Sequence, residues 1–270
     1  MKEFKSFYKE VDNRKFNTWC RWTKRLDLYG CGCSHDCAYC YAKSLLSFRG
    51  LWNPQEPAVA DLAKVEKRIA KLKPGTIVRL GGMTDCFQPM EAQEKATLRA
   101  VELLNQYGIG YLIVTKSDLV CDHRHVLDKS LAHIQISTTW IPAEKAVSTE
   151  RRIKAIETLQ AEGFDVAVRL SPYVPQFVDF DRLNAIQCPK IIVEFLRVNH
   201  WIRAWLPLDY SEYTVKHAGY NHLPLEKKLD ALAKITGFDQ VSVCEDVTEH
   251  YEYFREAVNC NKDDCCNLRK

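Results

Sequence analysis

Residues 76–115 of the chain read TIVRLGGMTDCFQPMEAQEKATLRAVELLNQYGIGYLIVT, and this stretch decides the fold. Its two ends, 76–80 and 111–115, are short apolar runs of the kind found in buried parallel strands. Between them, the apolar residues of 91–107 recur three or four positions apart and so form one face of a helix. Gly108 stands where a C-cap glycine belongs. Strand, helix and strand in this order predict a right-handed βαβ unit in a parallel sheet.

The same alternation continues along the rest of the chain. Further strand-like runs lie at 26–29, 134–137, 166–170, 191–196 and 240–243. A helix is predicted over 148–162, where Ser148 or Thr149 can cap the start and Gly163 ends it, and another over 224–236. The chain is therefore expected to be of the α/β class. The pattern alone leaves a doubly wound sheet and a (β/α) barrel open, and both place their chemistry in loops after the carboxyl ends of strands.

Composition excludes several classes of protein. The chain has 270 residues, 46% of them hydrophobic, and its 38 Lys and Arg nearly balance 35 Asp and Glu, so charge alone indicates neither a nucleic-acid nor a membrane partner. No apolar run approaches the roughly 18 residues of a membrane span, and 1–17 carries charges where a signal peptide would be apolar. We expect a cytoplasmic protein without a membrane partner, divided into an N-terminal arm (1–22), a core (23–200) and a C-terminal extension (201–270).

Twelve cysteines in a reducing compartment favour metal or redox chemistry over disulfides. Residues 31–41 read CGCSHDCAYCY and place four thiols in one loop. Structural zinc would need four ligands, and Cys31 or His35 could complete a tetrahedron with Cys33, Cys37 and Cys40, although zinc modules usually draw on two separated pairs. In a four-iron cluster, three thiolates would leave one iron open to a substrate or cofactor. Both possibilities remain open on spacing alone.

The spacing Cys33-x3-Cys37-x2-Cys40, with Tyr39 before the last cysteine, resembles the signature of the radical S-adenosylmethionine (radical SAM) enzymes. Within that superfamily the chain resembles the spore photoproduct lyase-like group, whose uncharacterised members are often labelled DNA repair photolyases. The resemblance covers roughly 28–200. It is carried by the cysteine loop and by four motifs at 84–91 (TDCFQPME), 115–117 (TKS), 136–139 (ISTT) and 168–172 (VRLSP).

The resemblance implies a partial (β/α)6 barrel of the TIM type, with a 4Fe–4S cluster and SAM at its carboxyl-terminal mouth and a short cysteine-containing C-terminal extension. It implies cleavage of SAM to a 5′-deoxyadenosyl radical that abstracts hydrogen from a substrate, with an electron donor of the flavodoxin or ferredoxin type. The implied cluster ligands are Cys33, Cys37 and Cys40. The implied cofactor-binding residues are Tyr39, Gly81, Gly82, Thr84, Asp85, Lys116, Ser137, Arg169 and Ser171. The candidate catalytic residues are Tyr39, Tyr41 and Cys86.

One departure concerns the substrate. Spore photoproduct lyase returns a hydrogen atom from a cysteine just before the Thr/Ser-Asp motif, where this chain has Gly82 and Met83, and Cys86 lies on the other side of the motif. Repair of the thymine photoproduct is therefore not expected. The aromatic and basic residues of 199–222, on the expected rim, favour a nucleobase or nucleic acid. Those of 1–25 could also bind a single strand, but we favour an arm that packs its aromatic rings across the open side of the barrel. The alternatives are radical modification of a peptide or small metabolite, and a non-catalytic metal-binding interaction module.

Four further thiols collect near the C-terminus, and they predict a second metal site, an auxiliary iron–sulfur cluster held by Cys244, Cys260, Cys265 and Cys266. Neighbouring residues such as Cys265 and Cys266 rarely both bind one cube, so three thiolates and another open iron would result. Alternatively, one of these thiols is the hydrogen-atom donor that positions 82 and 83 lack. The remaining interpretation is a set of reduced, metal-free thiols in a tail that closes over the barrel.

Overall fold

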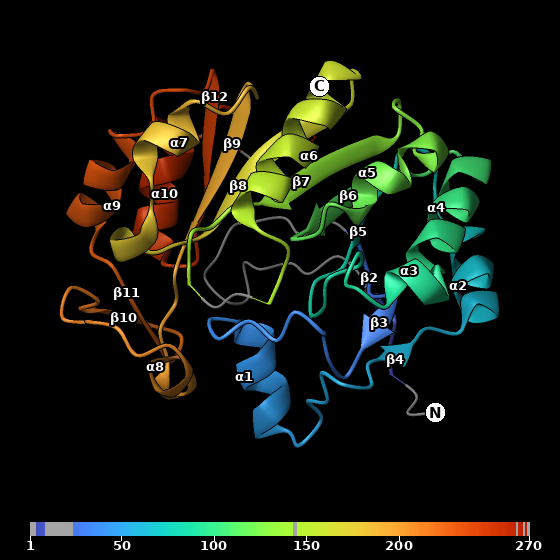
Figure 1. Ribbon diagram of the computed structural model, residues 1–270, viewed down its shortest axis with the longest axis horizontal. Helices are drawn as coiled ribbons and strands as arrows, with labels where there is room; N and C mark the ends of the chain where they lie inside the picture. The colour runs from blue at the N-terminus through green and yellow to red at the C-terminus, as the bar shows by residue number, and fades with distance from the viewer. Residues whose placement is uncertain (1–3, 9–23, 143–144, 263, 267, 269–270) are drawn as a thin grey trace.

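The computed structural model describes residues 4–8, 24–142, 145–262, 264–266 and 268, so most of the predicted N-terminal arm lies outside the described residues. A sheet of eight strands forms the centre of the molecule (Figure 1), in the order β1-β2-β5-β6-β7-β8-β9-β12. The strands are β1 (Phe7–Tyr8), β2 (Lys24–Leu26), β5 (Ile77–Leu80), β6 (Gly110–Thr115), β7 (Ala132–Ser137), β8 (Asp165–Tyr173), β9 (Lys190–Phe195) and β12 (Gln240–Cys244).

The sheet is an open barrel. The strands from β2 to β12 pair in parallel, whereas β1 pairs antiparallel with β2. The two edge strands, β1 and β12, are not paired with each other. The expected partial barrel is therefore confirmed, with β12 added as a seventh parallel strand. Both β1 and β12 come from outside 23–200, so segments of the predicted arm and extension share the sheet of the core, while the division into domains stays a prediction.

Helices cover the outside of the sheet and stand at its carboxyl end. The outer helices are α2 (Leu62–Ile69), α4 (Ala96–Gln106), α5 (Leu119–Asp122), α6 (Thr149–Ala161) and α7 (Phe180–Asn184). The C-terminal part adds the hairpin β10 (Val215–His217) and β11 (Tyr220–His222), then α9 (Leu225–Leu232) and α10 (Thr248–Ala257). Two helices, α1 (Tyr41–Phe48) and α8 (His200–Trp205), pack together at the bottom of Figure 1, away from the sheet. No helix in the described part of the chain is long and apolar enough to cross a membrane.

Most predicted helix ends are confirmed. Ser148 caps α6 by accepting the N–H of Arg151 at 3.4 Å, and Gly108 and Gly163 adopt φ values of +62° and +82° just after their helices. The helix expected over 224–236 ends at Leu232, four residues early. The strand expected at 26–29 is divided instead, because β2 ends at Leu26 and Tyr29 begins the small pair of β3 (Tyr29–Gly30) and β4 (Ala58–Val59). Between them, the carbonyl of Leu28 accepts from Ala60 (2.9 Å) outside the main sheet.

The helix predicted over 91–107 is wrong in one respect, because it is two helices. A short α3 (Glu91–Glu94) ends at Lys95, whose φ of +52° turns the chain before α4 begins. The cause is the buried side chain of Glu91, whose carboxylate accepts the N–H groups of Thr97 and Leu98, both at 2.9 Å. The Glu91 carboxylate thereby caps the start of α4 from outside that helix. In one continuous helix these two amides would already be bonded within the helix.

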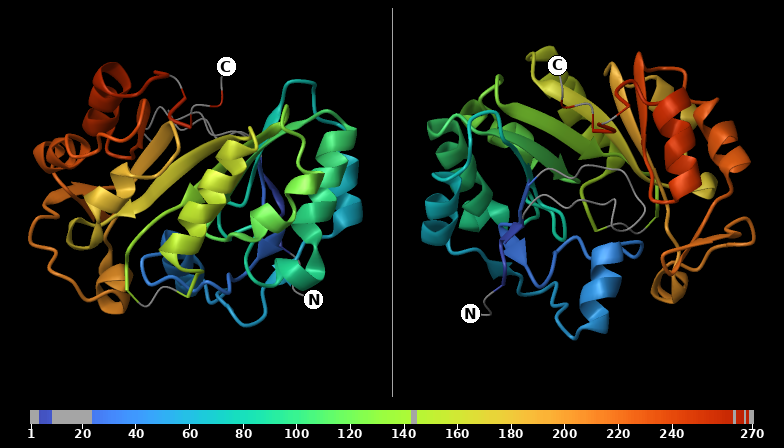
Figure 2. Two further views of the ribbon diagram at one scale, coloured as in Figure 1. Left: turned by 45° about the horizontal axis from the view of Figure 1, so that its top comes forward. Right: turned by 180° about the vertical axis from the view of Figure 1, so that it is seen from behind.

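The two faces of the sheet differ in polarity. The face under α4 and α6 is apolar, with residues such as Val78, Ile113 and Val168 in the main hydrophobic core. On the opposite face, Arg169 of β8 donates to Gln135 of β7 (2.8 Å) and to Glu194 of β9 (2.7 Å). The C-terminal tail lies on this inner face (Figure 2), where the Cys266 carbonyl accepts from Gln135 at 3.4 Å. The barrel interior is therefore a buried polar layer.

Candidate active site

The cysteine loop joins β3 to α1 in a tight wrap. Cys31 and Asp36 adopt positive φ values of 58° and 44°, which turn the chain twice within six residues. Inside the loop, the amide of Asp36 donates to the carbonyl of Cys33 (3.0 Å) and that of Cys40 to Cys37 (3.2 Å). A β-carbon at Gly32 would stand 2.0 Å from the carbonyl oxygen of Asn53, so only glycine fits there. These turns bring three cysteines onto one short loop.

The three thiols of the signature have different surroundings. Cys33 and Cys37 are buried, and the Sγ of Cys40 caps α1 by accepting the N–H of Lys43 at 3.5 Å. Burial raises the pKa of Cys33 and Cys40, but for Cys40 the amides at the helix start and the charges of Lys116 and Lys43 act in the opposite direction. A helix N-terminus and nearby cations stabilise thiolates, the form in which cysteine binds iron.

A single zinc ion fits the loop less well. Among the described residues, no three His, Cys, Asp or Glu side chains are grouped so that they could hold one metal ion. A cubane cluster makes a different demand, because each thiolate binds its own iron at a separate corner. The loop therefore does not present a preformed tetrahedral zinc site.

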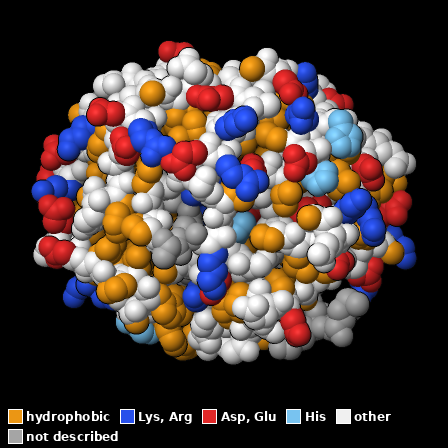
Figure 3. Space-filling view, viewed as in Figure 1, with side chains coloured by type: hydrophobic (Ala, Val, Ile, Leu, Met, Phe, Trp, Pro, Cys, Tyr) orange, Lys and Arg blue, Asp and Glu red, His pale blue; other side chains and the backbone are white. Residues whose placement is uncertain are grey.

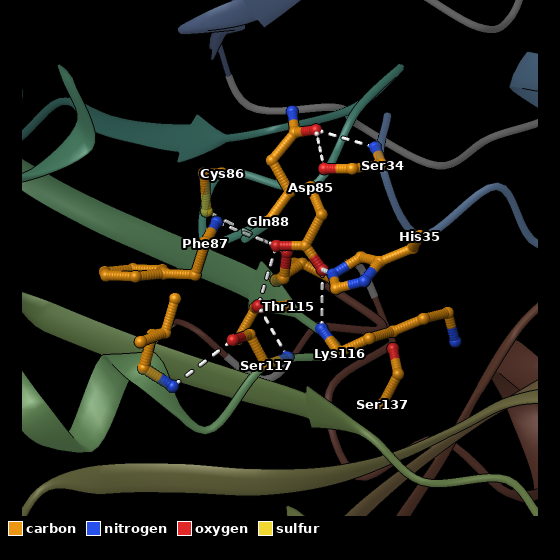
Figure 4. Close-up of polar contacts among 12 residues, drawn as sticks. Ser34, His35, Asp85, Cys86, Phe87, Gln88, Thr115, Lys116, Ser117 and Ser137 are labelled. Carbon is orange, nitrogen blue, oxygen red and sulfur yellow. Dashed lines mark hydrogen bonds and ion pairs between the residues drawn. The ribbon is translucent and has the colours of Figure 1, made fainter. Parts of the chain in front are cut away.

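Asp85 ties the loop to the ends of two strands (Figure 4). One carboxylate oxygen accepts from the amide of Phe87 (2.8 Å) and the hydroxyl of Thr115 (2.7 Å). The other accepts from the amide of Lys116 (2.6 Å) and lies 3.3 Å from Nε2 of His35 in the cysteine loop. Burial alone would raise the pKa of Asp85, but the contact with His35 and the hydrogen bonds from Thr115 and Lys116 lower it below its usual value. Asp85 is thus a buried carboxylate that anchors the loop.

A second tie runs from Gln88 to the same loop. Gln88 is fully buried, and its side-chain oxygen accepts from both the amide (2.8 Å) and the hydroxyl (2.9 Å) of Ser34. Sequence reasoning missed Gln88 and Ser34, and it considered His35 only as a zinc ligand. The sequence did offer a hint. Each of these polar residues lies inside a motif of the family resemblance, at 31–41 or at 84–91, and had no predicted role as a cluster or SAM ligand.

The glycine turn after β5 is shaped by contacts within the chain. Gly81 has a φ of +76°, and a β-carbon there would meet the carbonyl oxygen of Thr84 at 2.7 Å. A β-carbon at Gly82 would meet the side chain of Arg25 at 2.0 Å, and the Gly82 carbonyl accepts from the hydroxyl of Tyr41. Thr84 donates to the carbonyl of Tyr29 at 2.7 Å. The predicted contacts of Gly81, Gly82, Thr84 and Asp85 with SAM stay predictions.

Lys116 brings three predicted site residues together. Its Nζ donates to the carbonyl of Ser171 at 3.0 Å and lies 5.0 Å from the centre of the Tyr39 ring. Burial lowers the pKa of Lys116 to about 8, although the nearby thiols of Cys37 and Cys40 favour its charged form. Ser137 is buried at the end of the neighbouring strand β7. The cysteine loop, β6 and β8 therefore converge on one ammonium group.

Arg169 and Ser171 meet at a carboxylate that sequence reasoning missed. Glu194 accepts from the guanidinium of Arg169 (2.7 Å), the hydroxyl of Ser171 (2.8 Å) and the guanidinium of Arg197 (3.2 Å). Burial alone would raise the pKa of Glu194, but the two arginines lower it to about 2. Arg197 also stacks on Tyr41, 4.8 Å from the ring centre. A single carboxylate within the apolar run 191–196 was the signal for Glu194.

Cys86 lies apart from these groups. It is buried in the hydrophobic core, with Sγ directed at the carbonyl of Val114 (4.0 Å), and Figure 4 shows it and Lys116 on opposite sides of Asp85. Burial and the neighbouring carboxylate of Asp85 raise the pKa of the Cys86 thiol well above its usual value. Its proposed catalytic role stays a prediction.

The C-terminal thiols occupy different surroundings. Cys260 is exposed and its Sγ donates to the carbonyl of Val241 at 3.6 Å, whereas Cys265 is buried in the tail on the inner face. A hydrogen bond from Cys265 and the charges of Arg169 and Arg79 lower the pKa of Cys266 to about 6 against the effect of burial. Cys244 ends β12. The second cluster stays a prediction.

No family model matches the chain. An uncharacterized protein of Methanocaldococcus jannaschii is 25% identical over 164 residues, and the match spans 56% of this chain and 60% of that relative's length.

Solved structures of spore photoproduct lyase share the fold. A cysteine-to-serine mutant matches 94% of this chain and 78% of its own at a TM-score of 0.60 and 15% identity. A double mutant with bound AdoMet and dinucleoside spore photoproduct matches 86% of this chain and 74% of its own, at a TM-score of 0.55 and 16% identity. A third structure, with the dinucleoside photoproduct, matches 84% of this chain and 72% of its own, at a TM-score of 0.57 and 15% identity. The chain therefore resembles spore photoproduct lyase in fold, and the expected architecture is confirmed.

Proposed function

We propose that the chain is a radical SAM enzyme, and one observation carries the proposal. The Cys33-x3-Cys37-x2-Cys40 loop packs against the carboxyl ends of the parallel strands of an open barrel, tied there by Asp85 through His35. Support comes from the solved structures of the same fold, one of which contains AdoMet. When bound, the cluster and SAM supply a 5′-deoxyadenosyl radical that takes a hydrogen atom from the substrate.

The residues of the chain hold and orient these groups. The thiolates of Cys33, Cys37 and Cys40 would hold the cluster, and three protein ligands would leave one of its four irons open. Lys116, 3.0 Å from the Ser171 carbonyl, supplies a buried positive charge for the carboxylate of SAM. The ring of Tyr39 covers that ammonium on the side of the cysteine loop. Cys33, Cys37 and Tyr39 are buried, and they help to exclude water from the space in which a radical must react only with its substrate.

The test is SAM cleavage by protein reconstituted anaerobically with iron and sulfide and reduced with dithionite. Wild type should form 5′-deoxyadenosine, measured by chromatography. Cys37→Ala should abolish this product because a cluster ligand is lost. The matched control is Cys31→Ala, which removes a thiol of the same loop that lies outside the signature and should spare cleavage. An active Cys37→Ala protein ends the proposal, and a wild type that binds metal without cleaving SAM would be the non-catalytic module.

For the substrate we propose a nucleobase in a single-stranded nucleic acid. Solved structures of this fold bind a dinucleoside photoproduct. In this chain, α8 carries a row of rings, with His200 4.9 Å from Trp201 and Trp201 5.5 Å from Trp205. The ammonium of Lys43, from α1, lies 4.6 Å from the Trp205 ring centre. Rings for stacking and cations for phosphates are what single strands require.

Replacing Trp201 or Trp205 with alanine should weaken oligonucleotide binding. Each lost stacking contact costs about 1–3 kcal/mol, so affinity should fall roughly 5- to 150-fold, and wild-type binding should weaken steeply with salt. Fluorescence anisotropy with a labelled single strand measures both effects. Tyr107→Ala, which removes an exposed ring at the end of α4, is the control. Wild type that fails to bind at low salt would move the substrate to a peptide or small metabolite.

A further inference from the structure

Exposed apolar side chains gather on the segment that follows the cysteine loop. In the described part of the chain, the exposed large hydrophobic residues are Leu45 (37%), Phe48 (77%), Leu51 (39%), Tyr107 and Tyr253. The first three, here called the α1 patch, fall within seven positions, and Leu45 and Phe48 are three apart on one face of α1. Isolated exposed apolar residues are ordinary, whereas three of them so close together in the chain are a candidate interaction surface.

The α1 patch lies close to the proposed cluster. α1 starts at Tyr41, directly after the cluster ligand Cys40, whose Sγ caps the helix. Its eight residues span roughly 12 Å, so the patch stands within about one helix length of that thiol. Figure 1 shows α1 projecting from the molecule on the side away from the sheet. A protein seated on this helix end would therefore reach the cluster side of the barrel without covering the barrel interior.

Basic side chains surround the helix. Lys43 and Lys145 both contact Asp36, at 2.8 and 3.1 Å, so two cations share one carboxylate. Arg49 is exposed at the end of α1, and the next acidic residue along the segment is Glu56. The rim of the patch is therefore more basic than acidic. The rest of the visible surface mixes both charges (Figure 3), so this local excess is not part of a general basic field.

We propose that the α1 patch, with its basic rim, is the docking surface for a small acidic one-electron carrier protein that reduces the cluster. This inference rests on the proposed function. On docking, the carrier is oxidised by one electron and the cluster gains it. Transient redox complexes have small interfaces steered by charge, which three apolar side chains within a charged rim fit well. The aliphatic Leu45 and Leu51 cannot stack on bases, so the patch favours a protein over a nucleic acid.

The experiment compares Phe48→Asp with wild type, using an acidic flavodoxin as the probe. Phe48 is mostly exposed, so the substitution leaves the core intact while placing a negative charge in the patch. We expect the dissociation constant, measured by calorimetry on reconstituted protein, to rise at least about tenfold. SAM cleavage driven by reduced flavodoxin should fall accordingly, whereas cleavage driven by dithionite should match wild type. Tyr253→Asp, at an exposed ring on α10, is the matched control and should change neither quantity.

Each alternative result is decisive. Equal flavodoxin affinity in Phe48→Asp and wild type overturns the docking surface. The docking surface is also overturned if Phe48→Asp loses self-association or oligonucleotide binding while its flavodoxin binding is unchanged, because the patch then binds another partner. If wild type fails to cleave SAM even with dithionite, the proposed function is wrong, while the comparison of dissociation constants still decides the patch.

Discussion

Single side chains at this site act by joining segments that are distant in sequence. Asp85 gathers the cysteine loop and the starts of two turns through four contacts, from His35, Phe87, Thr115 and Lys116. Asp85 also fixes the position of Lys116, whose backbone amide donates to its carboxylate and whose side chain reaches Ser171.

Lys116→Ala should weaken SAM binding while leaving the cluster in place. Loss of a hydrogen bond to a charged group costs about 1.5–3 kcal/mol, so affinity for SAM should fall roughly 10- to 150-fold. Equilibrium binding of radiolabelled SAM measures the affinity, and the visible absorbance of the cluster reports its integrity. Lys154→Ala, at an exposed lysine of α6, serves as the control. Unchanged SAM affinity in Lys116→Ala would remove this lysine from the site.

The sequence predicted site residues that belong to local motifs, but it did not predict hydrogen-bond partners that lie on neighbouring strands. The cysteine spacing predicted the loop, and the strand-end motifs placed Lys116 and Ser171 near one another. Glu194 was missed because its meaning depends on Arg169 and Arg197, which reach it from β8 and from the turn after β9. Such contacts depend on the register in which neighbouring strands pair, and a single sequence does not reveal that register.

Individual elements depend on contacts that helix periodicity does not reveal. The apolar positions of 91–107 continue in phase across the break at Lys95, so the pattern predicts one helix. The buried Glu91 instead turns back to cap α4, and it also accepts from the hydroxyl of Tyr29 next to the cysteine loop. The start of α4 is thus fixed to the same region as the site.

Glu91→Ala should destabilise the protein by roughly 2–4 kcal/mol. The substitution leaves two helix amides and one hydroxyl buried without their acceptor, and such groups cost about 1–3 kcal/mol each before relaxation. Urea denaturation followed by circular dichroism measures the free energy of unfolding. Glu94→Ala, at an exposed position of α3, should change it by less than about 0.5 kcal/mol. A Glu91→Ala protein as stable as Glu94→Ala would show that the cap is dispensable.

Three neighbouring strands are joined at the amino end of the inner face by one carboxylate. Asp165 of β8 accepts from His133 of β7 and from Lys190 of β9, both at 2.5 Å. Burial alone would raise the pKa of Asp165, but these two partners lower it to about 2. The folded value is below that of the unfolded chain, so the stabilisation is present above about pH 4 and is lost as pH falls toward 2.

Asp165→Asn should therefore cost stability at neutral pH and little in acid. A shift of nearly two units corresponds to roughly 2 kcal/mol. The difference in unfolding free energy between wild type and Asp165→Asn should be near that value at pH 7 and should shrink between pH 4 and pH 2. Asp239→Asn, at an exposed aspartate, supplies the baseline. A difference that stays constant down to pH 2 would contradict the ion-pair explanation.

At the scale of the whole molecule, the βαβ rhythm predicted the α/β class, the family resemblance implied the partial barrel, and neither indicated the seventh parallel strand. The strand β12 was recognised in the sequence, but its pairing with β9 was not. The two strands are separated in the chain by α8, the β10–β11 hairpin and α9. A tail that closes over the barrel was one interpretation of the C-terminal thiols, and the structure places the carbonyl of Cys266 against Gln135 of β7. Gln135 holds this tail, because it donates to the carbonyl of Cys266 and accepts from Arg169 of the neighbouring strand.

The order of the sheet also determines the order in which the molecule can be completed during synthesis. From β5 to β9 each strand pairs with the one made just before it, so the sheet can grow as the chain emerges from the ribosome. The contact between Gln135 and Cys266 joins residues 131 positions apart. At about 5–20 residues per second, Cys266 follows Gln135 by on the order of ten seconds. The inner face of β7 therefore lacks its contact with the tail until the segment around Cys266 has been made.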